Sequence, residues 1–102
     1  MNPLDNNYLC NLYNIYKNLF TPKQQEYFKL YYLDNYTMQE IADVMGISKA
    51  ATQDAIKKIE KKLLNYEKKL NIYKERIEII NKLNKFIETK DEEIIEKIIK
   101  NI

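Results

Sequence analysis

The spacing of apolar residues along the chain predicts helices and no strands. Apolar side chains recur at steps of three and four, the period that places them on one face of an α-helix. The chain has one glycine and two prolines, too few for the many turns of a β-rich fold of this size. We therefore expect an all-α fold, with helices over residues 5–20, 22–33, 38–45, 49–80 and 90–100.

Capping residues mark where several of these helices begin and end. Pro22 suits the first position of a helix, because its missing N–H would have no partner there. Gly46 supplies the left-handed residue that ends the helix over 38–45, and Ser48 caps the next helix. Three threonines are each followed three residues later by Gln or Glu, the pattern of a capping box. These pairs are Thr21 with Gln24, Thr37 with Glu40, and Thr89 with Glu92.

A heptad pattern predicts that the fourth helix is long. Two apolar series, each with a seven-residue spacing, interleave at steps of three and four. At the next turn the pattern places the polar residue Asn84 where an apolar one is expected. We therefore expect a bend or break between Asn81 and Asn84. The seam is either covered by the chain's own first and last helices or joins two chains, and we favour a homodimer. Its residues are Ile56, Ile59, Leu63, Tyr66, Leu70, Tyr73, Ile77 and Ile80.

Residues 36–58 have the spacing of a helix-turn-helix. Ala42 is small where the second helix crosses the first, and Ile47 fills the gap after the turn. In this motif the N-terminal residues of the second helix meet base edges, while flanking groups hold phosphates. The candidate nucleic-acid-binding residues are Thr37, Gln39, Lys49, Thr52, Gln53, Lys57, Lys58 and Lys61.

Length and composition indicate one small domain over residues 1–102, with its core at about 8–65 and the long and terminal helices at about 66–102. Cys10 is the only cysteine and there is no histidine, which excludes an internal disulfide and a zinc site of Cys and His. No nucleophile stands beside a base, so we expect no enzyme, no metal and no cofactor. The chain shows no signal peptide and no membrane span, and we expect a cytoplasmic protein.

Although the net charge is only +2, the middle segment of the chain is basic. Residues 49–76 carry a balance of +5, against −2 for residues 1–48 and −1 for residues 77–102. An anionic partner would be met in this middle segment. Its six clustered lysines form a solvated helix face, or Lys57, Lys58 and Lys61 among them contact phosphates. Nine tyrosines lie mostly on apolar stripes, which favours core packing over stacking on RNA bases. The clustered lysines are Lys57, Lys58, Lys61, Lys62, Lys68 and Lys69.

Residues 19–63 resemble region 4 of bacterial sigma factors, and the whole chain is similar to the YlxM-type family of small helix-turn-helix proteins. The likeness to that family rests on the opening helix up to Phe20, the stretch Tyr31-Tyr32-Leu33-Asp34 and the block over 66–73, and it covers about residues 8–85. The resemblance implies a DNA-binding regulatory protein. It also implies a link to the signal recognition particle pathway.

The chain departs from the family at the reading face, where Ser48-Lys49-Ala50-Ala51-Thr52-Gln53 stands in place of the family's usual Ser-Arg-Gln-Ala-Val-Tyr. Lys49 has no planar fork for guanine, whereas Gln53 can pair with adenine. Two hypotheses follow. The first is a regulator that binds DNA rather than RNA. The second is a module that docks on the signal recognition particle or its RNA through the long helix, without sequence-specific DNA binding.

Overall fold

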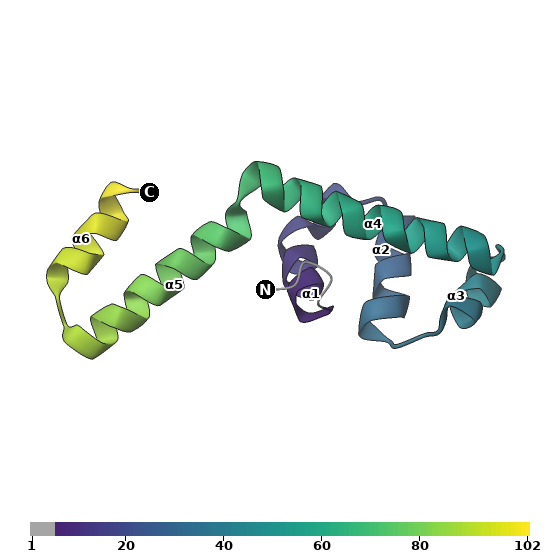
Figure 1. Cartoon of the computed structure of the whole chain (residues 1–102), viewed down its shortest axis with the longest axis horizontal. Coiled ribbons are helices and arrows are strands. Elements are labelled where there is room, and N and C mark those ends of the chain that lie inside the picture. Colours follow the sequence, from purple (N-terminus) through teal and green to yellow (C-terminus); the bar gives the residue numbers. More distant parts are fainter. Residues whose placement is uncertain (1–5) are drawn as a thin grey trace. The chain divides into compact units, whose positions relative to one another are not determined.

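The computed structural model describes residues 6–102, which are helical almost throughout and contain no strand. The all-α class expected from the sequence is therefore confirmed. The expected start of the first helix at Asp5 lies outside the described residues. In chain order the elements are α1 (Asn6–Tyr16), the 3₁₀ turn η1 (Lys17–Leu19), α2 (Pro22–Phe28), the π-helical turn η2 (Lys29–Leu33), α3 (Met38–Met45), α4 (Lys49–Leu70), α5 (Ile72–Thr89) and α6 (Glu92–Lys100) (Figure 1).

The backbone divides into two compact units, one ending at Leu70 and one running from Asn71 to Ile102. In the first unit α4 packs against α1, α2 and α3 (Figure 1). In the second unit α6 packs against α5, and Ile98 is the one buried residue there. The first unit therefore holds the hydrophobic core. Its fully buried side chains include Leu9, Leu12, Tyr16, Phe28, Ile41, Ile56, Ile59 and Leu63.

Aromatic rings fill much of this core. The ring of Tyr13 stacks on Phe28 with centroids 3.9 Å apart, and Phe28 stacks on Tyr32 at 4.6 Å. Of the nine tyrosines only Tyr36 is exposed; the rest are buried or half-buried. Core packing, the interpretation favoured from the apolar stripes, is confirmed for most of them.

The expected capping boxes at the starts of α2 and α3 are both present. Thr21 caps α2 with Pro22 at its first position, and Thr37 caps α3. Each threonine hydroxyl accepts a backbone N–H three residues on, at 3.1 Å, and satisfies a group that the helix itself leaves without a partner. The third expected box, at Thr89, is wrong. Thr89 is the last residue of α5, and the carboxylate of Asp91 caps α6 by accepting the Glu93 N–H at 3.0 Å.

The expected continuous helix to residue 80 is also wrong. α4 ends at Leu70, because Asn71 takes the left-handed conformation with φ 54°. Asparagine adopts this conformation at low cost, and apolar spacing carries no information about one polar residue's backbone. The predicted break at residues 81–84 is absent, since α5 runs unbroken to Thr89.

Part of the predicted dimer seam is buried within a single chain. Ile56, Ile59 and Leu63 are at most 2% exposed within a single chain, because α4 packs against α1, α2 and α3 there. Tyr66 contacts core rings, with its centroid 5.8 Å from that of Tyr16. The remaining seam residues follow the break or stand just before it. Leu70, Ile77 and Ile80 are exposed and Tyr73 is half-buried.

Candidate nucleic-acid interface

The helix-turn-helix is made by α3, a turn at Gly46 and α4. Gly46 has φ 68°, and its N–H donates to the Ala42 carbonyl at the end of α3. The next residue, Ile47, donates to the same carbonyl at 3.1 Å, which closes the turn. Ser48 then caps α4, its hydroxyl accepting the Ala51 N–H at 3.0 Å. Ala42 is 1% exposed, as expected for the small residue at the crossing.

The inner face of α4 is apolar except for three polar side chains. One of them is Thr52, which is 0% exposed and donates its hydroxyl proton to the Ser48 carbonyl at 3.1 Å. Thr52 therefore cannot reach a base edge, and its place among the predicted contacts is wrong. Its spacing, four residues before Ile56, already put it on the buried stripe.

The other two are acids, and both are bonded to tyrosines of the core. Glu67 is 7% exposed and accepts the hydroxyl of Tyr16 at 2.7 Å. Glu60 is half-buried and accepts the hydroxyl of Tyr32, and burial together with the charge of Glu60 raises the pKa of Tyr32. Two of the three acids of α4 thus face inward. This arrangement was not foreseen from the sequence.

The outer face of α4 carries lysines and one acid. Lys58 pairs with Asp54 at 3.1 Å, and their side chains are 73% and 65% exposed. A pair this exposed contributes little and is easily exchanged for a phosphate. Four other predicted contacts are also exposed on this helix, so five of the eight lie along α4. These four are Lys49, Gln53, Lys57 and Lys61.

Two predicted contacts lie at the start of α3 instead. Thr37 is exposed, and its hydroxyl is engaged as the cap acceptor. Gln39 is exposed and donates its side-chain amide to Asp43 at 2.9 Å. The carboxylate of Asp43 beside Gln39 disfavours a phosphate there. This end of α3 is therefore a weaker candidate contact than α4.

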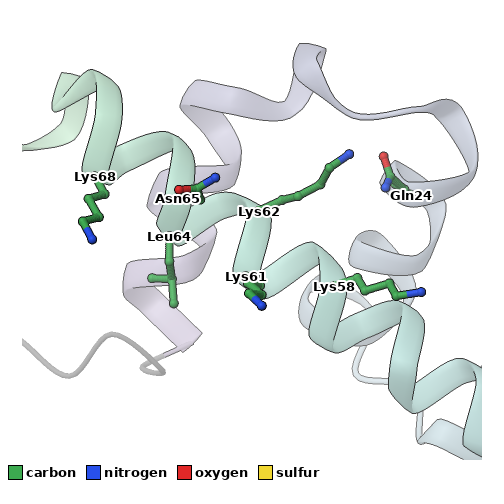
Figure 2. A pocket seen from close by; sticks show the side chains of 7 residues that line it. All are labelled: Gln24, Lys58, Lys61, Lys62, Leu64, Asn65 and Lys68. Atoms are coloured by element: carbon green, nitrogen blue, oxygen red, sulfur yellow. The ribbon is translucent and has the colours of Figure 1, made fainter.

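A hollow of about 650 Å³ lies beside the second half of α4. We name it the lysine hollow. Figure 2 shows Lys62 extending toward Gln24 of α2, while Lys61 and Lys68 extend elsewhere around the helix. Prediction from the sequence left Gln24, Lys62 and Lys68 out of the site. The hollow is lined by Gln24, Lys58, Lys61, Lys62, Leu64, Asn65 and Lys68.

The described residues show no other chemical centre. No group of three or more cysteine and acidic side chains comes together over residues 6–102 in a way that could hold a metal ion. Burial raises the pKa of the Cys10 thiol, which lowers its reactivity. In the same part of the chain, no helix combines the length and apolar character needed to cross a membrane.

A family model described as "Putative helix-turn-helix protein, YlxM / p13 like" matches residues 4–102. The chain belongs to this family, UPF0122. It is 42% identical to the UPF0122 protein of Geobacillus sp. (strain WCH70) over 79 residues, 74% of this chain and 72% of that protein. It is 37% identical to the UPF0122 protein of Oceanobacillus iheyensis over 90 residues, 85% of this chain and 84% of that protein. It is 44% identical to a UPF0122 protein of Mycoplasma capricolum subsp. capricolum over 81 residues, 79% of this chain and 71% of that protein.

The resemblance to the YlxM-type family drawn from the sequence is therefore confirmed. In this UPF0122 member the family's helix-turn-helix is formed by α3 and α4, and the exposed lysines stand on its second helix.

Proposed function

We propose that this UPF0122 protein is a non-catalytic regulator that binds duplex DNA through the exposed first half of α4. The main support for the proposal is the distribution of charged side chains around that helix. Its seven lysines are exposed and Asp54 is its one exposed acid, whereas Glu60 and Glu67 face the core and are held there by tyrosine hydroxyls. A helix-turn-helix lays the N-terminal end of this helix against base edges. Lysines beside it can then neutralise phosphates.

Few side chains on this face can form hydrogen bonds to base edges. Ala50 has no hydrogen-bonding side chain, and the hydroxyl of Thr52 is buried. Gln53 can pair with adenine, and Lys49 offers one ammonium group without a planar fork. A good bidentate contact discriminates by roughly 1–3 kcal/mol, against about 4–10 kcal/mol for a specific regulator. One copy should therefore bind many sequences with similar affinity.

Two copies would double the contacts, and the exposed face of α5 supports self-association. Ile77, Ile80 and Leu83 are 37%, 49% and 40% exposed, at helical spacing. The hairpin of α5 and α6 buries only Ile98, so it has little core of its own. We propose that this face joins two chains in a homodimer, in place of the longer seam expected from the heptads.

Sedimentation tests the dimer. The variant Ile80→Asp should be monomeric, because a charge would enter an apolar interface. The variant Lys85→Asp places the same side chain at an exposed polar position of α5 and should remain dimeric. A wild-type protein that sediments as a monomer at tens of micromolar would contradict the proposal.

Binding is tested with Lys49→Ala combined with Lys57→Ala. For B-DNA the logarithm of the binding constant falls with the logarithm of salt by about 0.9 per phosphate contact. The double variant should therefore flatten the salt slope by up to about 1.8. A wild-type slope in the double variant would count against this end of α4 as the contact. Gln53→Ala should leave the slope unchanged and reduce any preference for adenine in the site.

The sparse reading face favours a second candidate, a module that docks on the signal recognition particle or its RNA. The same titration separates the two functions when the particle's RNA is run beside duplex DNA. Tight binding to that RNA, without enrichment of any DNA sequence from a random pool, would favour the second candidate.

A further inference from the structure

Two lysines of the lysine hollow, Lys62 and Lys68, lie too far along α4 to belong to the base-reading contact. Lys62 is thirteen residues beyond Lys49, which places it about 20 Å further along the helix axis. Lys68 is six residues further on, about 28 Å from Lys49. A recognition helix reads bases with its first turns. The lysines of the second half therefore need a separate explanation.

The hollow has the charge and lining of a phosphate-binding surface. Four of its seven lining residues are lysines and none is acidic, although Lys58 pairs with Asp54 outside the lining. The nearest acids along this half of α4, Glu60 and Glu67, are turned inward toward Tyr32 and Tyr16. Leu64 is the one apolar residue of the lining, and the amides of Gln24 and Asn65 can donate to phosphate oxygens.

The lysines also flank the helix in two rows. Lys58 and Lys62 are four residues apart and share one row, while Lys61 and Lys68 are seven apart and share another. The Lys62 ammonium lies 5.6 Å from the centroid of the Phe20 ring, so a core residue of the first unit helps to orient this side chain. Phosphates on one side of α4 could contact only one row of lysines. A phosphodiester backbone that crosses the hollow can contact both rows.

We propose that the lysine hollow is a second nucleic-acid contact, which binds the phosphodiester backbone beside the segment that the first half of α4 reads. This inference rests on the proposed function, because it assigns the partner's phosphates to a surface outside the helix-turn-helix contact. The hollow adds affinity that does not depend on sequence. It also explains how a protein with so few base-reading groups holds a duplex.

The test uses the full chain carrying Lys62→Ala together with Lys68→Ala, titrated with random-sequence duplex DNA between 50 and 200 mM salt. Loss of both contacts should flatten the salt slope by about 1.8, so the wild-type advantage in affinity should shrink about twelvefold across that range. Every duplex should be affected by the same factor. Lys62→Arg with Lys68→Arg should keep the wild-type slope, since both charges remain.

The matched control removes two exposed lysines from α5, Lys82→Ala with Lys85→Ala. It changes the net charge by the same amount and should leave the slope unchanged. An equal flattening in this control would show that only net charge matters, and would overturn the proposal. Circular dichroism at each salt concentration verifies that the variants keep their helices.

The outcomes separate this inference from the proposed function. A wild-type slope in the Lys62/Lys68 variant, with a flattened slope in the Lys49/Lys57 variant, overturns the second contact alone. Wild-type slopes in both variants overturn both proposals. A flattened salt slope in the Lys62/Lys68 variant alone supports the hollow as a phosphate contact. It overturns the first half of α4 as the DNA contact.

Discussion

Removing the hydroxyl of Tyr16 tests what keeps the acidic side chain of Glu67 away from the basic face of α4. Tyr16 is 2% exposed and Glu67 is 7% exposed, and the hydrogen bond between them is 2.7 Å long. The two residues are 51 positions apart, so the bond ties α1 to α4. The variant Tyr16→Phe removes the donor and keeps the ring beside Tyr66, at 5.8 Å between centroids.

Hydrogen bonds to charged groups contribute about 1.5–3 kcal/mol to folding, and a buried carboxylate that loses a donor is costly. We therefore expect Tyr16→Phe to lower the free energy of unfolding by about 1.5–3 kcal/mol. Glu67→Gln keeps an acceptor for the hydroxyl and should cost less. Tyr16→Phe with Glu67→Leu removes both ends of the bond, so it should be more stable than Tyr16→Phe alone.

Urea unfolding of the wild type, of Tyr16→Phe and Glu67→Leu singly, and of the two combined makes a double-mutant cycle. The cycle cancels what each side chain does with its other neighbours and leaves the energy of the pair. A coupling energy of at least ~1.5 kcal/mol is expected on the magnitudes above. A coupling below ~0.5 kcal/mol would refute the view that this bond holds Glu67 inside the protein.

Three further predictions concern single positions. Gly46→Ala should lower stability by roughly 1–2 kcal/mol in urea unfolding, because φ is 68° while nothing lies within 4 Å of the added Cβ; Gly46→Asn should cost less. Lys90→Gly should raise the unfolding midpoint, since Lys90 holds φ 57° at the end of α5; an unchanged or lower midpoint would count against strain there. Hydrogen bonds from the backbone and side chain of Thr37 hold the pKa of Glu40 below its ordinary value of 4.5, so its stabilisation is present above that pH and is lost as the pH falls through the lowered pKa. Glu40→Gln should therefore lose less stability than the wild type between pH 6 and pH 3, and equal losses would contradict the assignment.

Local features of the fold could be predicted because each depends on a few neighbouring residues. The caps at Thr21 and Thr37 need only an acceptor and a residue three positions on. Gly46 is the single glycine of the chain, and it stands where α3 must end. The helix-turn-helix was predictable for the same reason, since its turn and flanking helices are contiguous in sequence.

The break at Asn71 and the burial of Glu67 could not be predicted in this way. The heptad spacing continues across Asn71, so periodicity alone favours an unbroken helix, and the left-handed backbone of one residue decides otherwise. Glu67 reads as a surface charge until its partner Tyr16, 51 residues away, is known. Thr52 is different, because its spacing from Ile56 placed it on the buried stripe and its small hydroxyl could bond within the helix.

Amide chemical shifts of the isotope-labelled protein, titrated with a short DNA duplex, test most directly whether α4 is the nucleic-acid contact. The account predicts that the shift changes concentrate on α4, from Lys49 through Lys68, and that the amides of α6 stay unchanged. Shift changes confined to residues 71–102, with none on α4, would contradict it.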